Sequence, residues 1–470
     1  MRAAFLLPLF SLVACGPASQ ATDAGQDAGD DAGIAVDSGV PRDLDIAVLR
    51  LTSDGQKDST FGTGGVRVFD FATATGSARD TVYGFDFDAQ GRVLLFGSTK
   101  ATGRSDVDRF VARLTLAGEL DTSFAVDGLH KLDLGGSNEA ARHGFVQADG
   151  KIVTAGYSPV PSGAVQADGG VQTANHVVLL RLLPDGAPDP TFGTDGIVKY
   201  DPWATTQGTP WGYAEAYGVV RQSSGRYVTA GYGRMGASGT VDVVSLRFDD
   251  TGKSDGTWNG SGVFTLDLIG GDDRARHAVL LPDDRVLIVG SATTLTSDVD
   301  ALVAMVKSDG SPDTSFGSGG NRTFAFSRKD EAFVAAALSP GALTLAAVGY
   351  RTGPANTDAE NDDAVLALIP LSAGGAPEFV QAVPLSTTGH DRFLSVAFDG
   401  NKVVAAGFVR EGNESKMAVA RFNLDGTRDA TFGTNGLVTF DLASGGTEET
   451  ARWLKVTTDG KYVIAGPIEH

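Results

Sequence analysis

The sequence predicts an all-β fold: a seven-bladed β-propeller whose blades each contain four strands. Three observations support this prediction. An apolar run that ends in glycine occurs seven times, a Phe-Gly-x-x-Gly turn recurs between these runs, and Asp-Gly turns separate further strand-like segments. The repeat unit is about 61 residues long and shows no helical periodicity. Four short strands with tight turns, used seven times, favour a propeller over a sandwich or a solenoid.

The first two strands of each predicted blade form a hairpin. The first strand alternates polar and apolar residues, as in 83–88, and an Asp-Gly turn such as Asp149-Gly150 follows it. The second strand is apolar throughout, which is typical of a strand covered on both faces by neighbouring sheets. These apolar runs lie at residues 93–97, 152–156, 227–231, 286–290, 344–349, 403–407 and 462–466.

The third predicted strand carries an arginine at one position in five of the seven units. We expect these arginines to pair with aspartate or carbonyl groups between blades. The fourth strand follows the Phe-Gly-x-x-Gly turn, as at 66–71 and 437–442, and the sixth unit departs from the pattern because residues 371–383 lack this turn. The recurring arginines are Arg50, Arg113, Arg181, Arg247 and Arg421.

The two ends of the repeat region predict how the ring closes. The repeats begin half-way through a unit at Asp45 and stop half-way through a unit at Gly466. Residues 45–71 would supply the two outer strands of one blade, and residues 449–466 would supply its two inner strands. Pairing of the N- and C-terminal strands in one sheet would remove exposed strand edges and complete the seventh blade.

Several phrases of the repeat resemble the bacterial delta-60 repeat. They are Ala-Asp-Gly-Lys-Ile-Val-Thr-Ala-Gly at 148–156, Asp-Gly-Ser-Pro-Asp-Thr-Ser-Phe-Gly at 309–317 and Val-Ala-Arg-Phe-Asn-Leu-Asp-Gly at 419–426. The resemblance covers nearly everything after residue 44 and is weakest at Trp258-Asn259 and in the sixth unit. It implies an extracytoplasmic protein with a propeller-like fold, and it supplies no catalytic residues.

Residues 1–14 are predicted to be a lipoprotein signal peptide. Arg2 precedes an apolar stretch too short to span a bilayer, and Leu12-Val13-Ala14-Cys15 resembles a lipobox. We therefore expect Cys15, the only cysteine of the chain, to be lipidated. An ordinary signal peptide with an incidental cysteine is the alternative. Gly16 resembles the residue found here in lipoproteins sorted to the outer membrane, so the expected location is the cell envelope, with a lipid anchor in the outer membrane.

Composition divides the remaining chain into a predicted tether, residues 15–44, and the propeller, residues 45–470. Between Gly16 and Pro41 the chain is mostly Asp, Ala, Gly and Ser without Lys or Arg, which predicts a disordered segment. The net charge of −20 argues against binding to nucleic acid or to an anionic membrane surface, so the membrane contact would be the lipid anchor alone. We expect the protein to be a monomer.

No sequence motif indicates catalysis. His143 and His277 occupy equivalent positions of the repeat, so repetition explains them better than a catalytic role. The acidic segment 358–363 could hold Ca²⁺, but it lacks the turn glycine of an EF-hand loop, and a solvated acidic loop is the simpler interpretation. We therefore expect no cofactor, with Ca²⁺ as the alternative.

Acidic residues recur at the start of the first strand of the units. If the blades are arranged radially, these residues would ring one mouth of the central channel and could bind a cation or a cationic group. Capping of loop amides is the structural alternative. The residues are Asp80, Glu139, Asp273, Glu331, Asp391 and Glu449.

Loop lengths predict which face of the propeller binds a ligand. The connections after the first and third strands are short, whereas the others contain insertions at 159–175, 202–212 and 351–362. Trp203, Trp211 and the adjacent Tyr213 are candidates for a platform that binds a carbohydrate or a peptide. Packing of both tryptophans over the blade ends is the alternative.

Three functions remain open from the sequence. The first is a binding or scaffold module of the envelope that recognises a polysaccharide, a peptide or an envelope protein. The second is a glycan-active hydrolase or lyase with carboxylates at the channel mouth. The third is a structural envelope protein without a specific ligand.

Overall fold

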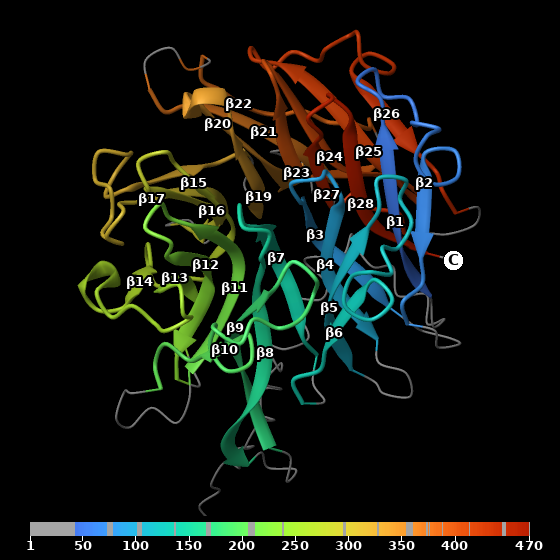
Figure 1. Ribbon diagram of the computed structural model, residues 1–470. Helices are drawn as coiled ribbons and strands as arrows, with labels where there is room; N and C mark the ends of the chain where they lie inside the picture. Colours follow the sequence, from blue (N-terminus) through green and yellow to red (C-terminus); the bar gives the residue numbers. More distant parts are fainter. Residues whose placement is uncertain are drawn as a thin grey trace, which may run out of the picture. The chain divides into compact units, whose positions relative to one another are not determined.

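The computed structural model contains seven four-stranded antiparallel sheets that together form a β-propeller (Figure 1). The fold class predicted from the sequence is confirmed. The structure describes residues 43–72, 79–100, 106–135, 138–165, 171–204, 212–236, 239–294, 298–326, 329–353, 361–372, 375, 377–387, 389–412, 414–443 and 448–469.

Each sheet runs from an inner strand to a short outer strand. The inner strands are β3 (Asp80–Phe87), β7 (Ala140–Val146), β11 (Gly212–Arg221), β15 (Asp273–Leu280), β19 (Glu331–Leu338), β23 (His390–Asp399) and β27 (Trp453–Val456). The second strands are β4 (Val93–Lys100), β8 (Ile152–Val165), β12 (Tyr227–Met235), β16 (Val286–Thr293), β20 (Thr344–Thr352), β24 (Lys402–Glu411) and β28 (Tyr462–Glu469).

The two outer layers complete the blades. The third strands are β5 (Val107–Leu114), β9 (Val171–Leu182), β13 (Asp242–Phe248), β17 (Val299–Val306), β21 (Asp362–Pro370), β25 (Glu414–Asn423) and β1 (Leu44–Leu51). The outermost strands are β6 (Leu129–Leu132), β10 (Ile197–Tyr200), β14 (Val263–Leu266), β18 (Asn321–Phe324), β22 (Phe379–Ala382), β26 (Leu437–Phe440) and β2 (Val66–Phe69). The described ranges also contain two short 3-10 helices, Trp258–Gly260 and Pro340–Ala342. No helix in these ranges is long and apolar enough to cross a membrane.

The ring closes through the two ends of the repeat region. Strand β1 pairs with β28 in an antiparallel register that runs from Leu44 opposite Glu469 to Leu51 opposite Tyr462. Figure 1 shows β1 in blue beside β28 in dark red. The inner strands contact one another in sequence from β3 to β27, and β27 contacts β3 again. The predicted closure is therefore confirmed.

The glycine that ends each apolar run is required by the inner strand beside it. In six blades the inner strand has a β-bulge opposite this glycine, for example between Val82 and Gly84 opposite Gly97. A Cβ added at the glycine would overlap a backbone carbonyl oxygen of the inner strand in six blades, and the carbonyl oxygen of Thr450, just before inner strand β27, in the seventh. The glycines are Gly97, Gly156, Gly231, Gly290, Gly349, Gly407 and Gly466.

The recurring arginines join neighbouring blades, as the sequence predicted. Arg181 Nε donates to Asp189 Oδ2 at 2.8 Å, and its Nη1 donates to the Asp250 carbonyl oxygen of the next blade at 2.6 Å. Its guanidinium lies 4.6 Å from the ring centre of Phe192 in the Phe-Gly turn. Arg50, Arg113, Arg247 and Arg421 repeat the aspartate bond at 2.8–2.9 Å and the interblade carbonyl bond at 2.5–2.9 Å.

The Phe-Gly turn also packs on the next blade. A Cβ at Gly186, the glycine of an Asp-Gly turn, would meet the Phe124 ring of the preceding blade at 2.8 Å. In the sixth unit, which lacks the Phe-Gly turn, Phe379 of β22 lies against Gly426 instead. The aromatic contact between blades is thus kept although its sequence motif is missing.

One predicted loop is a hairpin. The sequence analysis placed an irregular insertion at 159–175, but β8 and β9 continue to pair there, with Pro159 opposite Asn175 and Val160 opposite Ala174. Strand β7 ends its pairing with β8 at Tyr157, so beyond that point β8 has only one partner. Proline is tolerated on such an edge because no ladder donor is needed on the open side.

Candidate functional site

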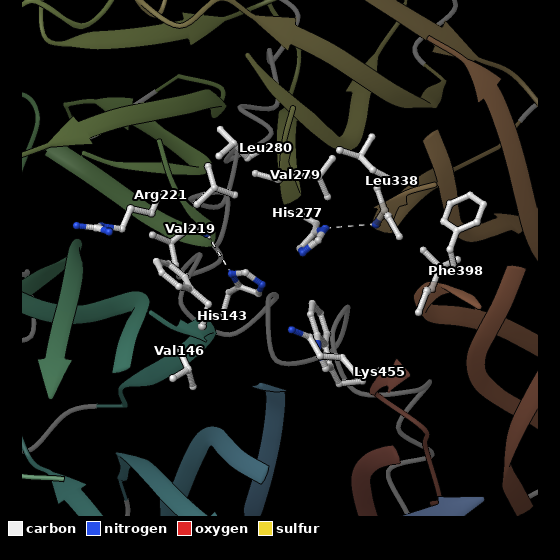
Figure 2. A pocket seen from close by; sticks show the side chains of 18 of the residues that line it. His143, Val146, Val219, Arg221, His277, Val279, Leu280, Leu338, Phe398 and Lys455 are labelled. Carbon is white, nitrogen blue, oxygen red and sulfur yellow. Dashed lines mark hydrogen bonds between the residues drawn. The ribbon is translucent and has the colours of Figure 1, made fainter. Parts of the chain in front are cut away.

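A cavity of the described structure lies where the inner strands end and the tight turns begin. We call this cavity the funnel. It has a volume of about 860 Å³ and is lined by residues of six inner strands and the turns that follow them (Figure 2). Gln147 and Ala148 lead into an Asp-Gly turn, and Ser339 begins the turn between β19 and β20. The funnel therefore lies on the face with the short, regular connections, which we call the tight-turn face.

Apolar side chains form most of the funnel wall. Val146, Leu280, Leu338 and Phe398 lie at or next to the ends of four inner strands and are half-buried, so each keeps part of its surface open to the cavity. Figure 2 shows these four side chains arranged around the opening. A cavity of this size with mostly apolar walls has the usual character of a site that takes a side chain or a small ligand.

Two histidines and a tryptophan form the floor of the funnel. The rings of His143 and His277 are 5.0 Å apart between centres and nearly perpendicular, at 81°. The Trp453 ring lies 5.4 Å from each of them. These residues occupy the position directly after the bulge, or its equivalent in β27. Small residues occupy this position in the other four blades: Gly84, Gly218, Ala335 and Ser395.

Side chains at this position also accept hydrogen bonds from backbone amides of the neighbouring inner strand. The Nδ1 atom of His143 accepts a hydrogen bond from the Val219 amide at 3.2 Å, and Nδ1 of His277 accepts one from the Ala336 amide at 3.3 Å. Ser395 Oγ accepts from the Leu454 amide in the same way, at 3.0 Å. In every second blade of this series, a side chain thus accepts the hydrogen bond of a backbone amide in the next blade.

Both histidines are neutral. Burial lowers the pKa of His143 to about 3 and, together with the nearby Lys455 charge, opposes its protonation. Burial, followed by the presence of His143 and Lys455, lowers the pKa of His277 well below its ordinary value. With Nδ1 accepting a hydrogen bond, the proton of each neutral imidazole is on Nε2. The floor offers aromatic rings and N–H donors rather than a base.

The charged groups of the funnel are cations with partners outside it. Lys455 Nζ donates to Asp86 Oδ1 at 2.6 Å, and Arg221 lies 3.3 Å from Asp250 Oδ1. Asp86 of β3 also accepts a hydrogen bond from the Val146 amide of β7 at 2.8 Å, so with Lys455 of β27 it links three blades. None of the described residues that line the funnel carries a carboxylate.

The predicted acidic ring is buried. Asp80, Glu139, Asp273, Glu331, Asp391 and Glu449 are each 0–2% exposed. They accept hydrogen bonds from loop amides. Glu139 accepts one from the Leu134 amide at 2.9 Å, and Asp391 accepts one from the Ser386 amide at 2.9 Å. Burial raises the pKa of Glu139 to about 7 and the pKa of Asp273 and of Asp391 to about 6. Of the two interpretations left open by the sequence, these hydrogen bonds match the capping of loop amides.

Trp203 and Tyr213 of the predicted platform lie at the opposite end of the inner strands from the funnel. Trp203 is half-buried and packs against a core cluster, where a Cβ at Gly233 would meet its ring at 2.9 Å. Tyr213 is 8% exposed and donates its hydroxyl proton to Glu215 at 2.8 Å. Trp211 and Cys15 lie outside the described residues, as does the first half of the acidic segment 358–363.

Three aspartates form a possible cation site. One carboxylate oxygen from each of Asp45, Asp70 and Asp80 lies within 4.8 Å of the other two. Asp80 already accepts the amides of Phe71 and Ala72. Carboxylate oxygens are the ligands Ca²⁺ prefers, but the hydrogen bonds from these two amides give Asp80 a structural role in the described chain.

Neither the funnel nor the place of Trp453 in its floor was predicted from the sequence. A signal for both was present, because Arg142-His143, Arg276-His277 and Arg452-Trp453 stand at equivalent places of three units, while Tyr83-Gly84 and Tyr217-Gly218 stand there in two others. Alternation of large and small residues at one repeat position indicates packing across a shared axis.

Comparison with known proteins supports a propeller-type repeat domain. Residues 43–61, 166–192, 281–316 and 399–432 match the family model described as "Domain of unknown function (DUF5122) beta-propeller". No curated protein matches the chain.

Solved structures with a similar fold share little sequence with the chain. Polysaccharide lyase Uly1 is 10% identical with a TM-score of 0.47, over 91% of this chain and 99% of that one. Sqt1 from Chaetomium thermophilum is 12% identical with a TM-score of 0.39, over 85% and 99%. The α-L-arabinanase of Penicillium chrysogenum, solved with arabinobiose, is 14% identical with a TM-score of 0.42, over 80% and 98%. These likenesses carry no functional argument.

Proposed function

We propose that the protein is a binding module whose funnel takes a large apolar side chain from a segment of a protein partner. The observation that carries this proposal is the apolar wall of the funnel above a floor of three aromatic rings. Apolar surface that a partner buries here would contribute about 25 cal/mol per Å².

The wall chemistry favours a peptide over a glycan. A sugar ring carries several hydroxyl groups, and each must find a hydrogen-bond partner once it is buried. The funnel supplies mainly Val, Leu, Ala and Phe side chains to such a ligand. Glycan hydrolysis by a pair of carboxyl groups also lacks candidates among the described lining residues. Binding of an apolar peptide segment requires neither group.

A displayed peptide library, selected on the full-length protein, tests this proposal. We expect the selected peptides to share large apolar side chains. They should bind the Leu338→Glu and Phe398→Glu variants, which we call the rim variants, at least tenfold more weakly, because each change places a charge in the apolar wall at the mouth of the funnel. Trp453→Ala should weaken binding as well. Val126→Glu is the matched control, since Val126 is 76% exposed in a turn outside the funnel.

Two results would contradict the proposal. One is a set of peptides that bind the rim variants as well as the wild type. The other is a glycan array on which the protein binds a polysaccharide and the rim variants abolish that binding. A Trp203→Ala variant on the same array examines the platform predicted from the sequence.

We also propose that Cys15 is the lipidated first residue of an envelope protein, with residues 15–44 as a tether. The sole cysteine at the end of a lipobox-like sequence supports this. Mass spectrometry of the N-terminal peptide should detect a diacylglyceryl group on Cys15. A Cys15→Ser variant that remains in the membrane fraction would count against the anchor.

A further inference from the structure

Two hydrogen-bond donors on the floor of the funnel lack an acceptor in the described chain. Nδ1 of His143 and Nδ1 of His277 each accept a hydrogen bond from a backbone amide, so each neutral ring carries its proton on Nε2. Among the described residues, neither Nε2 atom has a hydrogen-bond acceptor. His143 is 9% exposed, His277 is 7% exposed, and both line the cavity. A ligand in the funnel can therefore supply the missing acceptor.

The two donors lie close enough to share one ligand group. The His143 ring comes from β7 and the His277 ring from β15, and their centres are 5.0 Å apart. Figure 2 shows both rings turned toward the middle of the opening. An N–H···O hydrogen bond spans about 2.7–3.2 Å between its heavy atoms, so one small group between the rings can meet both donors. Trp453, 5.4 Å from each ring, completes the floor beside them.

Two amide side chains nearer the mouth of the funnel already have acceptors. Gln147 Nε2 donates to the Tyr227 hydroxyl at 3.1 Å. Gln222 Nε2 donates to the carbonyl oxygens of Asp284 and Ser308, at 3.1 Å and 3.0 Å. A ligand acceptor thus gains more at the floor than beside these glutamines, because the floor donors do not have to give up a partner.

A carboxylate matches the floor better than a neutral acceptor does. It has two oxygens, one for each donor, and hydrogen bonds to an ionised group are about twice as strong as those between neutral groups. The Lys455 ammonium, although bonded to Asp86, contributes to the lowered pKa of both histidines, and the same field favours an anion between them. None of the described lining residues carries a carboxylate that would repel this anion.

The wall next to the floor indicates which carboxylate fits. Ala278, Ala336 and Val396 each follow the floor position of their strand, and all three line the cavity. The last residue of a peptide carries its α-carboxylate beside its own side chain, so an apolar C-terminal residue can meet the floor donors and this wall together. An internal Asp or Glu would instead require the chain to leave the funnel in two directions.

We propose that the funnel binds the C-terminus of its partner, with the α-carboxylate between Nε2 of His143 and Nε2 of His277 and a large apolar last side chain against the wall. This inference rests on the proposed function, because it takes an apolar peptide as the ligand. It adds which end of the peptide enters the funnel and which protein atoms bind that end.

Synthetic peptides test this inference on the full-length protein. A library displayed with free C-termini is selected, and each selected sequence is made as the free acid and as the C-terminal amide. We expect a large apolar residue at the last position and about tenfold weaker binding of the amide by calorimetry, because the amide removes the charged acceptor. Replacing an internal Asp or Glu of the peptide by Asn or Gln should change the affinity less than amidation does.

The outcomes separate this inference from the proposed function. If acid and amide bind equally, or if only an internal carboxylate matters, the C-terminal inference is wrong and the apolar binding site remains. If no peptide with large apolar side chains is selected, the proposed function fails as well.

Variants assign the carboxylate to the floor. His143→Asn and His277→Asn each keep an oxygen that can accept the neighbouring amide but remove the Nε2 donor, so each should reduce the preference for acid over amide about threefold or more. His390→Asn is the matched control, since Nδ1 of His390 also accepts a backbone amide, from Asp362 at 3.1 Å, at the opposite end of β23 from the funnel. An unchanged preference in the folded floor variants would refute the assignment. If neither variant folds, the comparison of acid and amide on the wild type decides.

Discussion

The tight turns and the inner strands of this propeller use the same repeat in opposite ways. At the tight turns, five blades repeat one set of contacts between an arginine, an aspartate, an aromatic ring and a carbonyl group of the next blade. At the inner strands, the residue after the bulge is Gly, His, Ala, Ser or Trp, depending on the blade. Repeated positions hold the ring together, and the positions that differ form the funnel.

The largest expected effect is the loss of a repeated arginine. Arg181→Met should lower the free energy of unfolding by about 3–5 kcal/mol, because it removes both the 2.8 Å bond to the buried Asp189 and the interblade bond to the Asp250 carbonyl oxygen, and leaves Lys151 as the cation beside Asp189. Arg322→Gln, which breaks an exposed pair with Glu378, should cost less than about 1 kcal/mol. Urea denaturation of both variants measures the difference. Equal losses would mean that the interblade contacts are no stronger than surface ion pairs.

A second prediction concerns the glycine of the apolar runs. Gly407→Ala should destabilise the protein by about 1–3 kcal/mol or more, because its Cβ would overlap the Arg392 carbonyl oxygen opposite the bulge. Gly256→Ala is the control, since a Cβ there meets nothing within 4 Å. Thermal unfolding compares the two. A neutral Gly407→Ala would show that the inner strand can move away from its neighbour.

The floor histidines should contribute less to stability. His143→Ala removes the acceptor of the Val219 amide, and we expect a loss of about 1–3 kcal/mol from the unpaired buried donor. His143→Asn should lose less, because its side-chain oxygen can still accept. If binding of the selected peptides survives both changes while stability falls, the floor would serve the fold alone.

The smallest expected effect is on pH dependence, and it differs between the two sets of carboxylates. At the tight turns burial alone would raise the pKa of Asp189, but hydrogen bonds from Thr191 and the cations Lys151 and Arg181 outweigh it and lower the pKa. The stability that these carboxylates contribute is present above their unfolded pKa of about 3.9 and is lost as the pH falls below it. This set stabilises the fold at neutral pH.

The buried carboxylates of the inner strands behave in the opposite way. Burial raises the pKa of Glu139 to about 7, so the folded protein holds a proton that the unfolded chain releases near pH 4. Stability should therefore fall as the pH rises from about 4 through 7. Glu139→Gln should flatten this decline in a series of urea midpoints. An unchanged slope would assign the decline to other groups.

The accuracy of the sequence predictions follows the same division. Repeated spacing predicted the seven sheets, the pairing of β1 with β28 and the interblade role of Arg181, because each depends on contacts that recur in most or all units. The funnel depends on rings from three separate blades that meet at the axis, and spacing along the chain gives no distance between them. The sequence also favoured the face with long insertions, although the funnel lies on the tight-turn face.

Hydrogen exchange on the full-length protein, measured with and without a selected peptide, tests most directly whether recognition occurs in the funnel. The account predicts slower exchange at residues 145–148, 219–223 and 336–340, which line the cavity. Slower exchange confined to the region of Trp203 and Tyr213, with the funnel segments unchanged, would contradict it and place recognition on the opposite face.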